Sequence, residues 1–328
     1  MTLLAKSQVG VLRLTREYCR ARVRMRLLAL LTLAALLPTL AACEPPPLTD
    51  TGVVGVFGHS GLGPGEFTYP RAITIDASGR VFVVDKSARI QRFSPEGAFQ
   101  LEWAMPEKQA GKPVGLYAHT DGRLFVADTH YHRVIVFDFD GHELARFGTP
   151  GQGDGEFELP TDVAVDAHGF IYVSEYNGND RITQWTSDYK FVQSLIDGDV
   201  AGQPMRRPAA MDLDADQTLW VADACNHRIL HFDLTGKLLG HWGTMGVDAG
   251  QLRYPYDLVC TRDRKILLCE FGNNRLQWFD PSGNLQRTWG SLGRRLGELW
   301  APWGAAIGPN GRLYIVDSLN DRVQIVKP

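Results

Sequence analysis

The stretch FGTPGQGDGEFELPTDVAVDAHGFIYVSEYNGNDRITQW, residues 147–185, decides the fold, because near copies of it recur along the 328-residue chain. Each copy contains a proline that precedes an apolar segment, and successive prolines are 43, 47, 48, 47 and 47 residues apart. These prolines are Pro70, Pro113, Pro160, Pro208, Pro255 and Pro302. A repeat of this length is typical of a four-stranded propeller blade. The sequence therefore predicts an all-β fold, a six-bladed β-propeller over residues 53–328.

Three apolar segments recur in every unit, and in the third unit they read DVAVD, IYVSE and RITQW. The middle segment is apolar without strict alternation, as expected for a strand covered on both faces by neighbouring blades. A fourth segment ends in Phe-Gly or Trp-Gly and leads into a glycine-rich linker. The sixth unit stops at VQIVKP without this segment, but residues 53–58, VVGVFG, match it. We expect this N-terminal segment to supply the outer strand of the sixth blade and to close the ring.

Residues 22–43, RVRMRLLALLTLAALLPTLAAC, combine arginines with an apolar run that is too short for a comfortable transmembrane helix. They predict a signal peptide over residues 1–42, for which Met25 is an alternative start, and the small residues before Cys43 resemble a bacterial lipobox. A plain secretory signal with an accidental cysteine is the alternative. If Cys43 is lipidated, it anchors the protein in the cell envelope, and Glu44 favours the outer membrane. Residues 43–52 then form a proline-rich tether.

Removal of residues 1–42 leaves 27 basic and 36 acidic residues, a net charge of about −9. An exported acidic protein is a poor candidate for binding nucleic acid, so no nucleic-acid partner is expected. Three cysteines remain in the repeat region, and an odd number does not indicate a disulfide framework.

Two segments carry a resemblance to a known family. PTDVAVD at residues 160–166, and Asn226-His227-Arg228-Ile229 after a buried strand, resemble the NHL repeat. The resemblance implies a six-bladed propeller, but the family includes sensor domains, protein- and RNA-binding modules and a lyase that cleaves peptidyl-hydroxyglycine to an amide. The segment around Tyr176 is similar to the catalytic segment of the lyase. The lyase also has a zinc-binding histidine after a blade-opening proline, whereas this chain has none at those positions.

An acid followed by an arginine recurs in all six units. A residue pair that is present in every unit is better explained by a structural role than by a binding site. We expect each acid to pair with its arginine and to brace the loop between the second and third strands. The acids are Asp85, Asp128, Glu175, Asp223, Glu270 and Asp317, and the arginines are Arg89, Arg133, Arg181, Arg228, Arg275 and Arg322.

Residues that break the repeat point to a site at one mouth of the central channel. Aromatic and charged residues follow either the repeated acid or the blade-opening proline, and these loops should share one face. The predicted ligand-binding residues are Arg71, Asp162, Glu175, Tyr176, Tyr256, Asp257, Glu270, Phe271 and Trp303. The alternative is that these side chains only pack blade against blade.

Two functions fit this pattern. The favoured one is a monomeric, envelope-anchored module that binds a protein, peptide or glycan at the channel mouth. The alternative is a lyase or hydrolase of the peptidyl-hydroxyglycine type, with Tyr176, Glu175 or Arg71 as acid-base groups. His130 and His132 could bind a metal but have no evident third ligand, so we predict no cofactor, while a calcium or zinc ion in the channel stays open.

Overall fold

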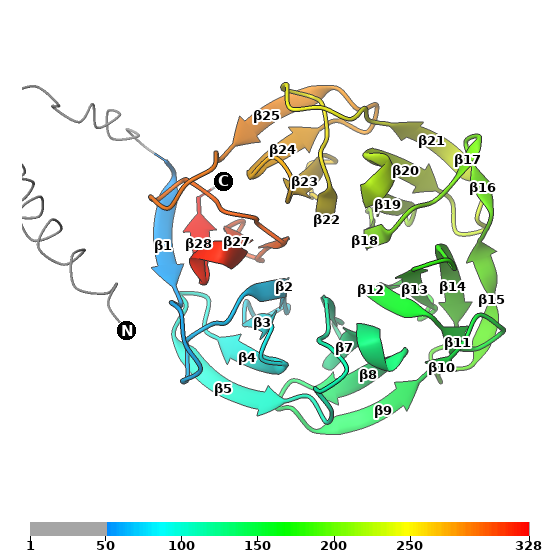
Figure 1. The fold of residues 1–328 in the computed structure, drawn as a ribbon, viewed down its shortest axis with the longest axis horizontal. Coiled ribbons are helices and arrows are strands. Elements are labelled where there is room, and N and C mark those ends of the chain that lie inside the picture. Colours follow the sequence, from blue (N-terminus) through cyan, green and yellow to red (C-terminus); the bar gives the residue numbers. More distant parts are fainter. Residues whose placement is uncertain (1–50, 328) are drawn as a thin grey trace, which may run out of the picture. The chain divides into compact units, whose positions relative to one another are not determined.

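The computed structural model describes residues 51–327, and the predicted signal peptide, Cys43 and most of the tether lie outside this range. The described residues form six four-stranded antiparallel sheets in a ring, which confirms the predicted six-bladed β-propeller (Figure 1). Within residues 51–327, no helix has the length and apolar character needed to cross a membrane.

In each of the first five blades, the four strands follow one another in the chain. Two short accessory strand pairs lie in linkers between blades. Blade 1 consists of β2 (Pro70–Ile75), β3 (Val81–Asp85), β4 (Arg89–Phe93) and β5 (Phe99–Ala104). Blade 2 consists of β6 (Gly115–Ala118), β7 (Arg123–Asp128), β8 (Arg133–Asp138) and β9 (Glu143–Phe147). Blade 3 consists of β12 (Leu159–Val165), β13 (Ile171–Tyr176), β14 (Arg181–Trp185) and β15 (Phe191–Ile196).

The remaining elements complete the ring. Blade 4 consists of β18 (Pro208–Leu213), β19 (Leu219–Asp223), β20 (Arg228–Phe232) and β21 (Leu238–Trp242), and blade 5 of β22 (Pro255–Cys260), β23 (Ile266–Glu270), β24 (Arg275–Phe279) and β25 (Leu285–Trp289). Blade 6 contains β26 (Gly304–Ile307), β27 (Leu313–Asp317) and β28 (Arg322–Val326). The accessory pairs are β10 (Thr149–Pro150) with β11 (Glu156–Phe157) and β16 (Asp199–Val200) with β17 (Gln203–Pro204). Three short 3₁₀ turns are η1 (Thr129–Tyr131), η2 (Ala224–Asn226) and η3 (Ser318–Asn320).

The fourth strand of blade 6 is β1 (Val53–Phe57), which pairs antiparallel with β28 and confirms the predicted closure of the ring. Phe57 joins the core of the seam, where its ring centroid lies 4.6 Å from that of Phe93. The fully buried Phe67 lies 5.6 Å from the same ring. Val54 and Val56 are exposed, so the buried contribution of this segment comes mainly from the aromatic rings.

The core is divided among the interfaces between blades. Six apolar clusters each join two neighbouring blades, including one that joins blade 6 to blade 1. Strands such as β13 and β19 are buried at almost every position because neighbouring blades cover both faces. This burial explains why their sequences do not alternate between apolar and polar residues.

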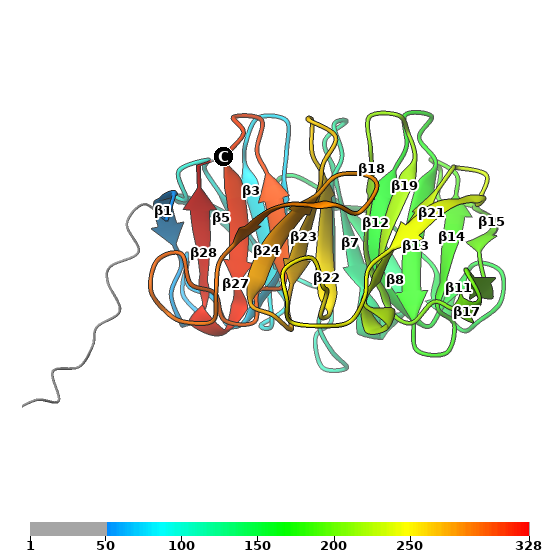
Figure 2. The same ribbon diagram turned by 90° about the horizontal axis from the view of Figure 1, so that it is seen from above.

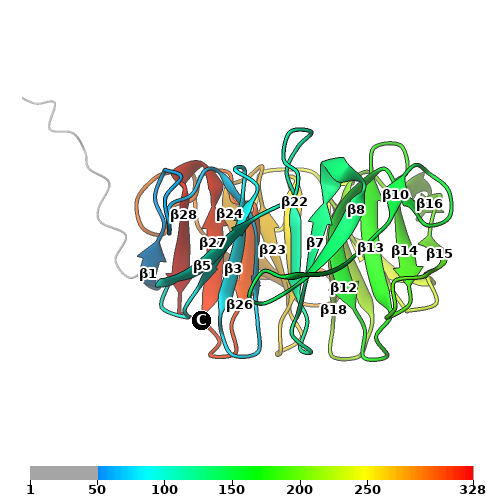
Figure 3. The ribbon, with the colours of Figure 1, turned by 90° about the horizontal axis from the view of Figure 1, so that it is seen from below.

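The strands run between two faces of the ring (Figures 2 and 3). We call the face that carries the blade-opening prolines and the loops between second and third strands the mouth face. The opposite face, called the back face, carries the turns between first and second strands and between third and fourth strands. Because Val53 pairs with Val326 and Phe57 with Val323, residues 51 and 52 and Lys327 lie at the back-face end of blade 6.

Candidate functional site at the channel mouth

The repeated acid and arginine form an ion pair in all six blades, as predicted. The N–O distance of these pairs ranges from 2.5 Å between Arg181 and Glu175 to 3.4 Å between Arg89 and Asp85. In blade 4, Arg228 also donates to the backbone oxygens of Val200 and Gln203 in the preceding linker, at 3.0 and 3.2 Å. The arginine therefore ties its loop to the linker that enters the same blade.

This bracing role corrects the prediction that Glu175 and Glu270 contact a ligand. Both side chains are fully buried and do not face the mouth. The Glu270 carboxylate accepts from the backbone N–H of Arg253 at 3.0 Å and from Arg275 Nε at 2.9 Å. Glu175 has equivalent partners, so neither carboxylate is available at the surface.

A second contact links the loop between second and third strands to the next blade in blades 3, 4, 5 and 6. His227 Nδ1 accepts from the backbone N–H of Tyr254 at 3.1 Å, and Asp321 Oδ1 accepts from that of Tyr69 at 2.7 Å. In both cases the donor precedes a blade-opening proline and has a positive φ of 50°. The histidine of the repeat is thus part of the scaffold. Its hydrogen-bond partner, the residue before the proline, has a left-handed backbone conformation, which is uncommon for residues other than glycine.

Five aromatic rings from four blades gather at the mouth. Tyr256 stacks on Phe271 with ring centroids 4.8 Å apart, and it lies 5.0 Å from Trp303. Trp303 also contacts Phe271 at 5.5 Å and Tyr69 at 5.8 Å. Tyr176 belongs to the same group through a shared arginine. All five rings are partly exposed, so they form an aromatic surface and not a closed core.

Two arginines lie against this aromatic surface. The guanidinium carbon of Arg207 is 4.5 Å from the ring centroid of Tyr256 and 5.0 Å from that of Tyr176, and its Nη1 donates to the Tyr256 hydroxyl at 3.0 Å. The guanidinium carbon of Arg71 is 5.3 Å from the centroid of Trp303.

No acid among residues 51–327 neutralises the charges of these two arginines. Within the described chain neither arginine forms an ion pair, and the Nε atoms of Arg71 and Arg207 are buried without a hydrogen-bond partner. Burial lowers the pKa of Arg71, and the nearby charge of Arg207 also lowers it. Partly buried guanidinium groups normally pair with carboxylates or phosphates, so this arrangement is suited to an anion.

Arg207 and Tyr69 were not among the predicted site residues. Both directly precede a blade-opening proline and have positive φ angles, 59° and 50°. A left-handed residue before a proline is unusual, because proline restricts the residue before it. The sequence shows that both residues precede a blade-opening proline. It does not show the hydrogen bonds from their backbone N–H groups to Asp180 and Asp321, which hold the backbone in this conformation.

Asp162 and Asp257 lie inside the channel, where they line a constriction, a space of about 30 Å³, together with Arg71, Tyr256 and Trp303. Each of the two carboxylates accepts a backbone N–H from the next blade, Asp257 from Ala305 at 2.7 Å and Asp162 from Met211 at 2.8 Å. Asp212 does the same with Cys260. Burial is the main cause that raises the pKa of Asp212 and Asp257 to about 7. These carboxylates join blades.

The wider part of the channel, about 300 Å³, opens beyond the constriction, and Asp162, Asp212 and Asp257 line it. Nowhere in residues 51–327 do three or more histidine, cysteine or acidic side chains form a group that could hold a metal ion. His130 Nδ1 lies 3.4 Å from the backbone oxygen of Lys112, while His132 Nδ1 contacts the backbone oxygen of Glu158. The donor set therefore does not fit a metal, and we derive no chemical step through one.

Comparisons with known proteins agree with this fold. A family model described as a 6-bladed beta-propeller matches residues 112–232. NHL repeat-containing protein 3 from Mus musculus is 26% identical over 197 residues, which cover 54% of this chain and 56% of that protein. Peptidylglycine alpha-amidating monooxygenase from Rattus norvegicus is 32% identical over 197 residues, which cover 56% of this chain and 18% of that protein. The matches span only part of these relatives.

A solved streptogramin B lyase has the same architecture, with a TM-score of 0.59 and 17% identity over 83% of this chain and 97% of that chain. At this identity the likeness concerns the fold alone. The chain is a six-bladed β-propeller with NHL-repeat homologues.

Proposed function

We propose that the channel mouth binds a protein or peptide segment that carries a carboxylate beside an apolar or aromatic side chain. The observation that carries this proposal is the pair Arg71 and Arg207, two guanidinium groups with no acidic partner among the described residues, set against five aromatic rings. A carboxylate can accept two parallel hydrogen bonds from a guanidinium, and aromatic surfaces give large contact areas at low entropic cost. An acidic glycan has the same chemistry and is the other ligand to screen.

The test compares tripeptides that end in phenylalanine with a free carboxylate and the same tripeptides with a carboxamide end. Calorimetric titration should show that the free acids bind roughly tenfold more tightly or better. The double variant R71Q/R207Q should lose this preference. R206Q is the matched control, because Arg206 is the exposed neighbour of Arg207 in the chain. Equal binding of acid and amide, or an equal loss in R206Q, would contradict the proposal.

We further propose that the propeller is held at the bacterial envelope through lipidated Cys43, with no metal or organic cofactor. The sequence before the tether supports this anchor. Detergent-phase partitioning of the C43S variant tests it: the wild-type protein should enter the detergent phase, and C43S should stay in the aqueous phase. Partitioning of C43S into detergent would contradict the anchor.

An amidating-lyase activity is the second candidate. It is supported by the similarity to peptidylglycine alpha-amidating monooxygenase and by the contact of Tyr176 with Arg207 at the mouth. Of the three predicted acid-base groups, Glu175 is occupied by its brace, which leaves Tyr176 and Arg71. Incubation with a peptidyl-hydroxyglycine and detection of the amide by mass spectrometry tests this activity, with Y176F as the variant. Binding without amide formation would favour the first proposal.

A further inference from the structure

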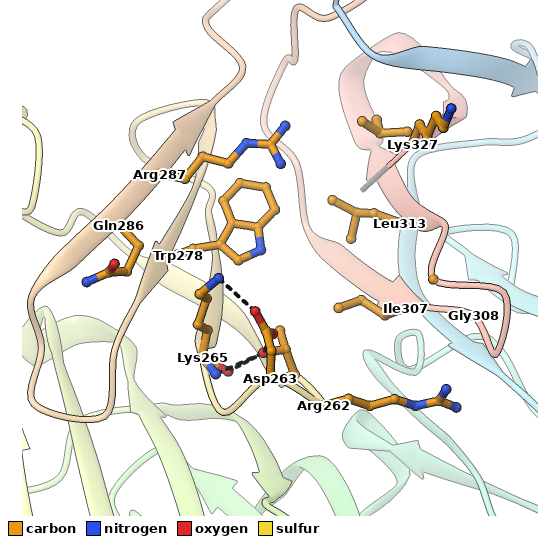
Figure 4. Close-up of a pocket in the computed structure, with 13 residues that line it drawn as sticks. Arg262, Asp263, Lys265, Trp278, Gln286, Arg287, Ile307, Gly308, Leu313 and Lys327 are labelled. Carbon is orange, nitrogen blue, oxygen red and sulfur yellow. Dashed lines mark hydrogen bonds and ion pairs between the residues drawn. The ribbon is translucent and has the colours of Figure 1, made fainter.

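A cavity lies between blades 5 and 6 at the back face, on the opposite side of the ring from the aromatic mouth. Its volume is about 530 Å³, which is within the usual range of sites for small molecules. Figure 4 shows Trp278 at its centre, with Ile307 and Leu313 across from the indole. The cavity is separate from the mouth, and the function proposed above does not use it.

The connectivity of the ring explains why a cavity lies at this interface. In blades 2 to 5, the turn between third and fourth strands packs on the preceding blade. The turn of blade 2 shows this: the ring of Phe139 lies 5.1 Å from that of Phe82 in blade 1, and Arg92 of blade 1 donates to Asp140 at 2.7 Å. In blade 6 the corresponding strands are β28 and β1, which are not consecutive, so no such turn joins them. Among residues 51–327, no such turn therefore covers Trp278, which is aligned with Arg92 in the repeat.

The lining combines an apolar wall with a basic rim. Trp278, Ile307, Leu313 and the buried Val326 form the wall. The rim residues share a positive charge, and they are Arg262, Lys265, Arg287 and Lys327. The acid that lines the same cavity, Asp263, is paired with Lys265 at 2.7 Å.

Among the described residues, three of the four positive charges have no acidic partner. Arg262, Arg287 and Lys327 form no ion pair within residues 51–327, and the guanidinium carbon of Arg287 lies 5.0 Å from the centroid of Trp278. This local excess of positive charge contrasts with the chain as a whole, which has 37 acidic and 34 basic residues. Unpaired cations around a concave apolar surface attract anions and concentrate them locally.

We propose that this seam cavity is a second binding site, for a small amphiphilic anion: an aromatic or acyl group with one carboxylate, sulfonate or phosphate. The apolar part of the ligand packs on Trp278 between Ile307 and Leu313. The anionic group is held at the rim by Arg262, Arg287 and Lys327, all of which are exposed enough to reach it. A neutral ligand of the same shape gains only the apolar part of this interaction.

The experiment uses naphthoate and its neutral analogue naphthamide as probes, and the indole N–H signals of the eight tryptophans as readout. The Trp278 signal is assigned with the W278F variant and reports the seam cavity, while the Trp303 signal reports the mouth. Naphthoate should move the Trp278 signal saturably, and naphthamide should bind roughly tenfold more weakly or worse.

The double variant R262Q/K327Q should remove the preference for naphthoate and leave the remaining indole signals in place, because both side chains are exposed. R264Q is the matched control: Arg264 lies on the same turn as Arg262 but pairs with Asp216 and does not line this cavity. Movement of the Trp303 signal alone, equal affinities for the two probes, or the same loss in R264Q would overturn the proposal.

Discussion

The arginines of the six braces and the two arginines of the mouth belong to the same fold but have opposite surroundings. Each brace arginine faces a buried carboxylate, as Arg228 faces Asp223 at 2.7 Å. Arg71 and Arg207 lie against aromatic rings, and within the described part of the chain neither forms an ion pair. The difference teaches that residue type alone does not separate scaffold from site in a repeat protein. The repeated charges are paired and brace their loops, whereas the mouth charges that break the repeat lie against aromatic rings.

We expect closure of the ring to contribute most to the stability of the protein. Opening the ring should therefore cause the largest loss of stability. Deletion of residues 51–69 removes β1 together with Phe57 and Phe67, which bury apolar surface worth roughly 1.5–3 kcal/mol each, and exposes the edge of β28. The truncated protein should aggregate or have a much lower thermal midpoint in a calorimetric scan.

The control for this deletion is the double variant V54T/V56T, because both valines are exposed on β1. It should melt close to the wild type. If the deletion and V54T/V56T melt alike, the sixth blade does not depend on its N-terminal strand.

The second effect concerns a single brace. The substitution R228L leaves the fully buried Asp223 carboxylate without its partner, and loss of one member of a buried pair costs about 3–5 kcal/mol. Chemical denaturation should report a loss of this order. The exposed pair of Arg264 and Asp216 provides the control, since R264Q should change the free energy of unfolding by about 1 kcal/mol or less. An equal loss of unfolding free energy in R228L and R264Q would contradict the expected difference between the buried brace and the surface pair.

A smaller effect should appear as a pH dependence. The pKa values of Asp212 and Asp257 are raised to about 7 in the fold, against about 3.9 in an unfolded chain, so the folded state holds more protons between these values. The free energy of unfolding should therefore fall as the pH rises from about 4 to about 7, and these two groups should contribute no further change above this window.

The measurement is the thermal midpoint of the wild type and of D212N at about pH 5.5 and about pH 8. The wild type should melt a few degrees lower at the higher pH, and D212N should show a smaller difference, because asparagine does not titrate. The change caused by acids that do not interact with Asp212 cancels in this comparison. A larger difference in D212N than in the wild type would contradict the raised pKa.

Much of the ring could be predicted from the sequence, because its determinants are local and repeated. The proline spacing gave six blades, and the strand that blade 6 lacks in sequence was found before Pro70. The aromatic residues Tyr176, Phe271 and Trp303 were placed at one mouth because aligned positions of a repeat occupy equivalent places in a ring. In the structure Phe271 contacts Trp303, and Arg207 lies over the ring of Tyr176.

The parts that could not be predicted depend on contacts between blades. Arg207 reaches the mouth because Asp180 Oδ1 accepts its backbone N–H, which a linear pattern does not reveal. Glu270 was expected to face a ligand at the mouth, but its carboxylate accepts hydrogen bonds from the backbone N–H of Arg253 and from Arg275 Nε. The seam cavity arises because β28 and β1 come from distant parts of the chain, which matters only once the blades are packed.

The smallest change in stability is expected at the mouth. Arg71 and Arg207 carry like charges close together, so their replacement removes repulsion and breaks no ion pair. The double variant R71Q/R207Q should lose the hydrogen bond of Arg207 to the Tyr256 hydroxyl, which is worth about 1 kcal/mol, and regain a similar amount from the relief of charge repulsion. Its thermal midpoint should therefore stay within a few degrees of the wild type. A fall as large as that of R228L would mean that the mouth arginines are also braces, and the aromatic surface would then be inter-blade packing.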